Sequence, residues 1–160
     1  MPIEVTALDH LYIAVSDLAA SEAFYDPVMR LLDFRKGTGS IAGESHVHYY
    51  NRVMHYTIRP ARGEVPFDPY AVGLHHVCLR VPTREDVDAV ARDLGTLGIE
   101  ATEPRAFPEY DADYYATFFE DPDGIRLEIV AEVARRRIIR EKWSLLTEWE
   151  NPLAKAGLWP

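Results

Sequence analysis

Two similar stretches decide the fold: LDHLYIAV at Leu8–Val15 and LHHVCLRV at Leu74–Val81. Leucine, histidine and valine recur at the same places, and apolar residues alternate with other residues in both stretches. Their starts lie 66 residues apart, which indicates one duplicated unit rather than an array of short repeats. Alternation of this kind is typical of a β-strand with one buried face. We therefore expect two copies of one module, each beginning with a strand.

A predicted helix follows each stretch. In the first copy, Asp17 is placed to cap a helix over 18–32, although Pro27 inside it should kink or split the helix. In the second copy, Thr83 precedes two acidic residues, and Gly98 should end the helix. The remaining apolar runs are predicted to be strands, at 34–41, 46–51, 54–59, 100–102, 114–120 and 125–130.

These elements predict an α+β fold of two βαβββ modules that form a cup-shaped mixed sheet, plus a C-terminal helix. The Asp121–Gly124 turn should join the last two strands as a hairpin. A basic, amphipathic helix is expected over 133–149 and should end at Asn151-Pro152, packing on a sheet or on a second copy. The chain is divided as a single domain over 1–160, with module one at 5–61, a linker at 62–72, module two at 73–132 and an extension at 133–160.

Composition narrows the function classes. The 160 residues include 17 basic and 26 acidic side chains, which give a formal net charge of -9. This balance argues against a general nucleic-acid binder, because phosphate binding needs a basic face. No run approaches the roughly 18 apolar residues of a membrane span, and the first ten residues do not read as a signal peptide. The single cysteine, Cys78, excludes an internal disulfide, so we expect a cytoplasmic protein with a small-molecule partner, no nucleic acid and no membrane.

Three strands are predicted to bring metal-binding side chains to one surface. Successive side chains of a strand point to opposite faces, so the apolar residues should meet the helices. His10, His76 and Glu128 then fall on the other face of their strands. Two imidazoles and one carboxylate suit a divalent first-row metal and leave positions open for water or substrate. The sequence therefore predicts a metal site at these three residues.

The stretches LDHLYIAVSDLAASEAFY, GLHHVCLRVPT and YYATFFEDPDGIRLEIV resemble the vicinal oxygen chelate superfamily, over about 8–130. This superfamily includes glyoxalases, extradiol dioxygenases, fosfomycin-resistance enzymes and bleomycin-resistance proteins. The resemblance implies paired modules whose sheets form a metal-holding cup, with His10, His76 and Glu128 as the ligands. It also implies a divalent metal ion (Fe, Mn, Zn or Ni) that chelates two neighbouring oxygens of the substrate, and a homodimer.

The sequence departs from part of that family pattern. Many members, glyoxalase I among them, have a fourth ligand on the strand that corresponds to 54–59. Thr57 stands at that position here and is a poor ligand, which favours a site with two histidines and one carboxylate. His55 and His48 are the candidates for a fourth ligand or for a general acid or base, since imidazole titrates near neutral pH.

Several polar residues are predicted to contact a substrate, namely Tyr12, Thr57, Arg59, Arg80, Tyr115 and Arg126. The three arginines could bind a carboxylate or phosphate of an anionic substrate, or could lie in solvent at strand ends. Tyr12 shares a strand face with His10 and could donate a hydrogen bond to a bound oxygen or pack as an aromatic ring. Tyr115 ends the loop 103–115, which is either a flap over the cup or an ordinary connection.

Two function classes follow from this reading. The first is a metal-dependent enzyme acting on a small substrate with two neighbouring oxygens, by lyase, isomerase or ring-cleaving dioxygenase chemistry. The second is a non-catalytic drug- or metabolite-binding protein of the bleomycin-resistance type. Bleomycin-binding members generally lack the metal ligands, so the presence of all three here favours the enzyme.

Overall fold

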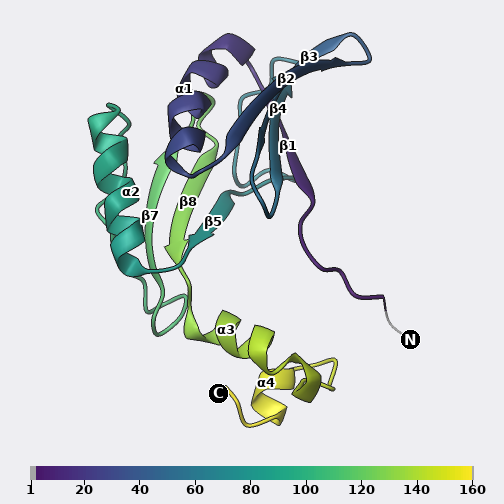
Figure 1. Ribbon diagram of the computed structural model, residues 1–160, viewed down its shortest axis with the longest axis vertical. Coiled ribbons are helices and arrows are strands. Elements are labelled where there is room, and N and C mark those ends of the chain that lie inside the picture. The colour runs from purple at the N-terminus through teal and green to yellow at the C-terminus, as the bar shows by residue number, and fades with distance from the viewer. Residues whose placement is uncertain (1–2, 160) are drawn as a thin grey trace.

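The structure is a computed structural model that describes residues 3–159 (Figure 1). Its first module consists of β1 (His10–Val15), α1 (Leu18–Leu31), β2 (Arg35–Ile41), β3 (Glu44–Tyr50) and β4 (His55–Pro60). Its second module consists of β5 (Val77–Val81), α2 (Arg84–Thr96), β6 (Arg105–Ala106), β7 (Tyr115–Glu120) and β8 (Arg126–Ala131). The chain ends in α3 (Ala134–Glu141), a 3₁₀ turn (Trp143–Leu145) and α4 (Pro152–Lys155).

The two modules have the same topology, which confirms the predicted duplication of a βαβββ unit. The strand orders are β1-β4-β3-β2 and β5-β8-β7-β6, in two separate four-stranded sheets. In each sheet the first and last strands of the module pair in parallel, β1 with β4 and β5 with β8, and the other pairs are antiparallel. Strand β1, which carries His10, and strand β5, which follows His76, are therefore edge strands of their sheets.

Alternate residues of these strands face the core, as the sequence pattern predicts. Ile13 and Val15 of β1 are buried, whereas His10, Tyr12 and Ala14 are exposed. In the second module, the residues that face the core are Val77, Leu79, Val81, Leu127 and Ile129. The helices α1 and α2 cover these apolar faces (Figure 1).

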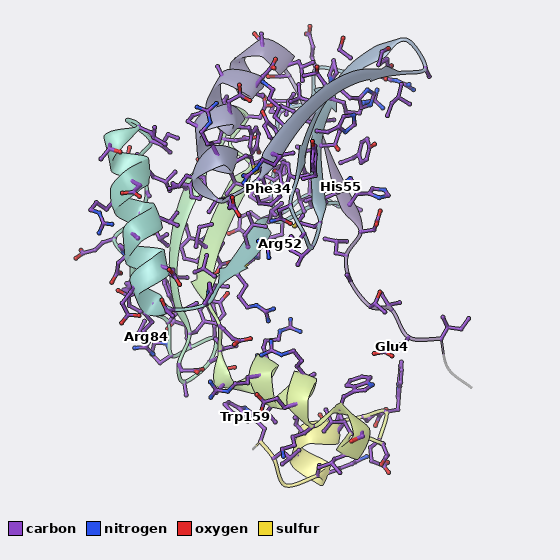
Figure 2. All side chains as sticks on the ribbon, viewed as in Figure 1. Glu4, Phe34, Arg52, His55, Arg84 and Trp159 are labelled. Atoms are coloured by element: carbon purple, nitrogen blue, oxygen red, sulfur yellow. The ribbon has the colours of Figure 1, made fainter. Side chains whose placement is uncertain are left out.

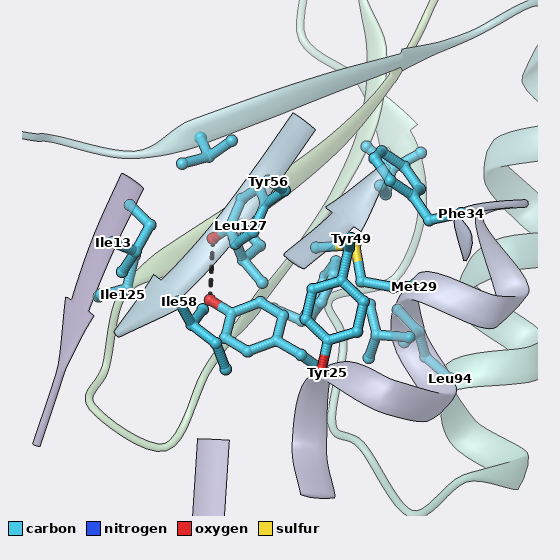
Figure 3. Packing of buried hydrophobic residues seen from close by; sticks show 14 of the residues in the cluster. Ile13, Tyr25, Met29, Phe34, Tyr49, Tyr56, Ile58, Leu94, Ile125 and Leu127 are labelled. Carbon is cyan, nitrogen blue, oxygen red and sulfur yellow. Dashed lines mark hydrogen bonds between the residues drawn. The ribbon is translucent and has the colours of Figure 1, made fainter. Parts of the chain in front are cut away.

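One core joins the two modules. Tyr25 of α1 is fully buried, and its hydroxyl lies 2.9 Å from that of Tyr56 on β4 and donates to Asp121 Oδ2 at 2.9 Å. Figure 3 shows Tyr56 packed near Leu127 of β8, so the helix-side faces of both sheets contribute to the same cluster. The opposite, polar faces are turned away from this core. The first-module histidines lie on the polar face of one sheet, and the second-module site residues lie on that of the other.

The predicted helix starts are confirmed. Asp17 Oδ1 accepts hydrogen bonds from the amides of Ala19 and Ala20, at 2.9 and 3.0 Å. Thr83 forms a capping box with Asp86, and Gly98 ends the second helix with a positive φ of 73°. Of the two outcomes predicted at proline, a kink or a split, the split is wrong, because α1 is one helix that includes Pro27. Its buried face holds it against the sheets and offsets the missing hydrogen bond.

Other boundaries differ from the sequence predictions. The predicted strand 100–102 makes only an isolated bridge at Ala101, and a two-residue strand, β6, lies inside the loop 103–115. The predicted helix over 133–149 stops at Glu141, since its later apolar residues find no core to pack on. Asn151-Pro152 does not end a helix but begins α4, where proline suits the first turn.

The hairpin at Asp121–Gly124 is confirmed. The Gly124 amide donates to the Asp121 carbonyl at 2.9 Å, and Gly124 has a φ of 79°. No helix within residues 3–159 is long and apolar enough to cross a bilayer. Met1, Pro2 and Pro160, which belong to the predicted domain and its extension, lie outside the described residues.

Candidate metal site

The second module brings two of the predicted ligands together. His76 directly precedes β5, and Glu128 lies on the neighbouring strand β8, where it pairs in register with Cys78. The His76 Nε2 and Glu128 Oε2 atoms are 3.1 Å apart, and the Glu128 side chain is only 3% exposed. Tyr114 donates its hydroxyl hydrogen to Glu128 Oε1 at 2.6 Å. A nearly buried carboxylate is thus held between an imidazole and a phenol.

The surroundings of this carboxylate change two neighbouring pKa values. The pKa of the Cys78 thiol is raised to about 12, chiefly by desolvation and further by the Glu128 carboxylate, although the residue as a whole is exposed. Desolvation, with the hydrogen bond to Glu128, also raises the pKa of the Tyr114 hydroxyl. Both groups keep their protons at neutral pH. Cys78 is therefore a thiol, not a thiolate nucleophile.

His10 belongs to the other sheet. Its Nδ1 donates to Asp9 Oδ2 at 2.7 Å, and this hydrogen bond is the main reason why the pKa of Asp9 is lowered. The Nε2 atom of His10 is left for another partner. His76 is arranged in the same way, because its Nδ1 lies 2.6 Å from His75 Nδ1 while its Nε2 faces Glu128. Metal-binding histidines are commonly oriented by a hydrogen bond at the second ring nitrogen.

The polar face around His10 is rich in aromatic rings. The His10 and Tyr12 rings are 5.4 Å apart, those of Tyr12 and His46 are 5.9 Å apart, and the His46 and His48 rings are stacked at 5.9 Å. His55 pairs in register with His10 across β4 and β1. Figure 2 shows His55 on the side of the sheet away from α1. This face supplies imidazoles but no carboxylate close to His10 except Asp9.

His48 has a defined partner on that face. Its Nδ1 lies 2.9 Å from the hydroxyl of Thr57, which leaves Nε2 as the free nitrogen. Partial burial, together with the nearby His46 and His55, lowers the pKa of His48 below its ordinary value. The imidazole is accordingly neutral at pH 7, the form that accepts a proton.

Within residues 3–159, no three side chains of His, Cys, Asp or Glu lie close enough together to hold a metal ion. The structure joins His76 to Glu128 and leaves His10 on the separate sheet of module one. His48 and His55, the candidates for a fourth ligand, share the module-one face with His10. The pair in module two fits two ligands of a divalent metal, because it offers one nitrogen and one buried carboxylate oxygen at an accessible surface.

The three arginines predicted to bind an anion are in different situations. Arg59 forms an ion pair with Glu44, and Arg80 lies 3.5 Å from the Glu132 carboxylate. Arg126 makes no ion pair within the described chain and lies over the Phe118 ring at 4.2 Å. An open groove of about 590 Å³ borders Arg126 and Phe118, but its lining does not include the His76 and Glu128 pair.

Two residues predicted to contact a substrate make hydrogen-bond contacts with other side chains of the chain. Tyr115 faces α2, where its hydroxyl donates to Asp88 Oδ1 at 2.8 Å, because the strand alternation that places Tyr114 at the site turns the next residue away. Thr57 is only 1% exposed and lies behind His48, where its hydroxyl contacts Nδ1 of that ring. Tyr12 is 44% exposed and stays available on its face.

Sequence reasoning missed the aromatic wall of module two. The rings of Phe107 and Phe118 pack edge to face at 5.3 Å, and Tyr114 packs against Phe107 at 6.5 Å. Phe118 pairs in register with Glu128, so this wall adjoins the carboxylate. Strand alternation over 114–120 could have identified Phe118. This residue shares a face with Ala116, whereas Phe119 points to the core.

Known proteins share this architecture. The sequence profile of the Glyoxalase/Bleomycin resistance protein/Dioxygenase superfamily matches residues 7–129. The chain belongs to this superfamily. The Escherichia coli strain K12 protein YaeR, itself uncharacterized, is 29% identical over 126 residues, covering 75% of this chain and 92% of its own.

Solved structures of the superfamily agree in fold. The glyoxylase/bleomycin resistance protein/dioxygenase domain from Frankia sp. EAN1pec has a TM-score of 0.67 at 22% identity, covering 81% of this chain and 100% of its own. The genomically encoded fosfomycin resistance protein FosX from Listeria monocytogenes has a TM-score of 0.63 at 18% identity, covering 86% and 99%. The superfamily match ends at residue 129, close to the end of β8, so α3 and α4 lie outside it.

Proposed function

We propose that the protein is a metal-dependent enzyme of this superfamily that acts on a small substrate with two neighbouring oxygen atoms. The observation that carries the proposal is the His76–Glu128 pair, with 3.1 Å between Nε2 and Oε2 and a carboxylate that is 3% exposed. Such a carboxylate is costly to bury without a cation, which a divalent metal would supply. When bound, the metal would act as a Lewis acid on the substrate oxygens.

The third ligand in this proposal is His10 of the partner subunit in a homodimer. Strands β1 and β5 are both edge strands of their sheets; His10 lies on β1, and His76 directly precedes β5. In each histidine the Nδ1 atom contacts a neighbouring side chain, Asp9 or His75, so Nε2 is the nitrogen that would bind the metal. Bringing β1 of one copy to β5 of the other would cover both edges, which are otherwise open to unwanted pairing. It would also place the imidazole face of one copy opposite the carboxylate of the other. A twofold dimer would contain two such sites.

Other residues have roles that follow from this arrangement. We assign His48 as the general acid or base, because Thr57 fixes its Nδ1 and its Nε2 is free. Tyr114 positions the carboxylate of Glu128 by its hydroxyl hydrogen bond. Arg126, which has no carboxylate partner within the described residues, is the candidate to attract an anionic group of the substrate.

A binding protein of the bleomycin-resistance type is the second candidate. The observation that favours it is the absence of a three-ligand cluster within residues 3–159 of one chain. In that case the aromatic faces around Tyr12 and Phe118 would hold a ligand without metal. Lyase, isomerase and dioxygenase chemistry within the first candidate, and a cytoplasmic location, stay predictions.

The decisive experiment combines metal analysis with subunit mixing. Protein purified without chelator should contain close to one metal ion per chain, of the Fe, Mn, Zn or Ni type. The variants His10→Ala and Glu128→Gln should each lose it, whereas Glu120→Gln, which changes an exposed carboxylate of β7, should retain it.

Mixing the two metal-free variants tests whether the site is shared between subunits. A heterodimer of His10→Ala and Glu128→Gln chains contains one site with all three ligands intact. Each heterodimer should therefore bind up to one metal ion, which is half of the content of the wild-type dimer. No recovery in a verified heterodimer contradicts the shared site. A metal-free wild type that still binds small molecules from a catechol, methylglyoxal-thiol or fosfomycin screen supports the binding protein.

A further inference from the structure

The C-terminal arm, residues 133–159, carries large apolar side chains that no other part of residues 3–159 covers. Trp143 is 61% exposed, Leu145 57% and Trp149 96%. Figure 1 shows the arm beyond the ends of β5 and β8, and its α3 packs on the 3₁₀ turn rather than extensively on either module. Tryptophan at such exposure is unusual for a surface that faces only water.

The root of the arm is nevertheless fixed to module two. Arg135 lies 3.0 Å from the buried Asp111 carboxylate, and Arg140 lies 2.6 Å from Glu132. The Ala134 amide donates to Asp113 Oδ2 at 2.7 Å. These bonds hold α3 at a set angle to β8, so the arm projects from the body in a defined direction.

Charge distinguishes the arm from the rest of the chain. Residues 133–160 contain six basic and three acidic side chains, whereas residues 1–132 contain 11 basic and 23 acidic ones. The arm therefore has a net charge of +3, and the remainder has -12. A surface of this kind is attracted to the body of another copy of the same protein.

We propose that the arm clasps the partner subunit, packing on the exposed apolar segment that precedes its β1. This inference rests on the proposed shared site. In that dimer, His10 of the partner subunit meets Glu128, which is six residues before the start of α3, so the segment 3–8 of the partner leaves from the root of the arm. That segment contains Ile3, Val5 and Leu8, which are 95%, 86% and 61% exposed in this chain. Twofold symmetry makes the contact reciprocal.

A membrane surface is the competing partner, because basic residues and tryptophans are typical of interfacial helices. The structure favours the protein partner. Arg135 and Arg140 are already paired with carboxylates, and α3 has only eight residues, with Ile138 and Ile139 half-buried. The excess negative charge of the body would also be repelled by anionic lipid headgroups.

The protein contains its own probe of this contact. All three tryptophans of the chain, Trp143, Trp149 and Trp159, lie in the arm, so fluorescence excited where tyrosine does not absorb reports the arm alone (Figure 2 labels Trp159). The full-length protein should be diluted through its dimer–monomer transition, followed by sedimentation velocity. Tryptophan emission should shift to longer wavelength in step with dissociation, and added salt should move both transitions to higher protein concentration.

Substitutions then test the two sides of the contact. Trp149→Asp in the arm and Val5→Asp in the N-terminal segment should each raise the dimer dissociation constant roughly tenfold or more. Combined, they should raise it by less than the product of the single effects, because both remove the same contact. The control Leu97→Asp changes a 45%-exposed apolar residue at the end of α2 and should leave the dissociation constant within about twofold.

The outcomes separate this inference from the proposed function. A dimer that retains its metal but dissociates without a change in emission overturns the clasp and leaves the shared site standing. A metal-free monomer at every concentration overturns both. A blue shift that appears only with vesicles of anionic phospholipid, and not on dimerisation, assigns the arm to the membrane surface instead.

Discussion

The polar faces of the two modules differ far more than their apolar faces do. The β1 face of module one carries four imidazoles, from His10, His46, His48 and His55, and no carboxylate beside His10 other than Asp9. The β5 face of module two carries Glu128 within an aromatic and apolar wall. The helix-facing sides, by contrast, both contribute to one cluster.

This difference shows where a duplicated unit is free to change. Residues that face the common core must fit one another closely, since buried side chains pack at crystal-like density. Residues on the outer faces have no such constraint and can specialise. One face carries a set of imidazole rings and the other a nearly buried carboxylate, so the metal site proposed above needs a face of each kind.

The largest effect on the free energy of unfolding is expected when the hydrogen bond between Tyr25 of module one and Asp121 of module two is removed. Asp121 is 6% exposed and accepts from the Tyr25 hydroxyl and from the amides of Asp123 and Ile125. We expect Asp121→Ala to lower the free energy of unfolding by about 3 kcal/mol, because buried donors lose their acceptor. Urea denaturation followed by circular dichroism measures it.

The matched control is Asp123→Ala, which removes the exposed contact to the Ser16 amide, 2.9 Å long in the native chain. It should cost about 1 kcal/mol or less. Because one core joins the modules, both variants should still unfold in a single transition. Two separate transitions would contradict the shared core.

Removing the metal should have the next largest effect, and it acts on the dimer. A metal that bridges the two unlike faces stabilises only the paired state, by about 1.4 kcal/mol for each of the two sites when the free metal is about ten times its dissociation constant. We expect a chelator to raise the dimer dissociation constant by about 100-fold in sedimentation equilibrium. The Glu128→Gln dimer should not respond to chelator, and a wild-type dimer that loses metal without weakening would disprove the bridge.

The caps of α1 and α2 should contribute about equally to the free energy of unfolding. Asp17 accepts from two amides at the start of α1, and Thr83 forms a capping box at the start of α2. We expect Asp17→Ala and Thr83→Ala each to cost about 1 kcal/mol of unfolding free energy. Thermal denaturation of the two variants side by side measures the difference. Costs that differ by more than about 1 kcal/mol would show that the repeated helices are not equally important to the common core.

The smallest effect is expected where each helix is tied to its sheet by a tyrosine and an aspartate. Tyr49 donates to Asp26 at 2.8 Å in module one, and Tyr115 donates to Asp88 at 2.8 Å in module two. Burial alone would raise the pKa of Asp26, but hydrogen bonds from Lys36 and Tyr49 outweigh it and lower the pKa below 3.8. We expect Asp26→Asn to cost about 0.5 kcal/mol at neutral pH.

The sign of its pH dependence follows from that lowered pKa. The unfolded chain takes up the proton first, so the contribution of Asp26 is present above pH 3.8 and is lost as the pH falls through the folded-state pKa. Acid titrations of unfolding should therefore be less steep for Asp26→Asn than for wild type. Asp88→Asn is the control. An equal change in the steepness of the acid titration for both variants would show that the contact with Lys36 does not cause the pH dependence.

Much of the fold was accessible from local signals. Alternation in Leu8–Val15 and Leu74–Val81 identified the duplicated strands, and Asp17 and Thr83 identified the helix starts. Strand alternation also placed Glu128 on the face opposite to Leu127 and Ile129. These signals depend on neighbouring residues of one element, so they can be read without knowing the tertiary packing.

The end of the chain shows where such signals fail. Apolar spacing over 133–149 predicted one helix, yet helical order ends at Glu141 because most of a helix's stability comes from packing that the arm does not find in its own chain. The choice of Tyr115 as a substrate contact overlooked its orientation. Its choice depended on the loop before it rather than on the strand parity that turns it toward α2.

The sequence by itself determined the module, its duplication and the chemical types of the candidate ligands, because strand alternation and helix capping are local. Only the tertiary structure decided how the ligands are distributed. The two modules form separate sheets that share one core around Tyr25, which left His76 with Glu128 and placed His10 on the other sheet. Which faces meet depends on the burial of apolar area over the whole chain, and no single stretch of sequence contains that information.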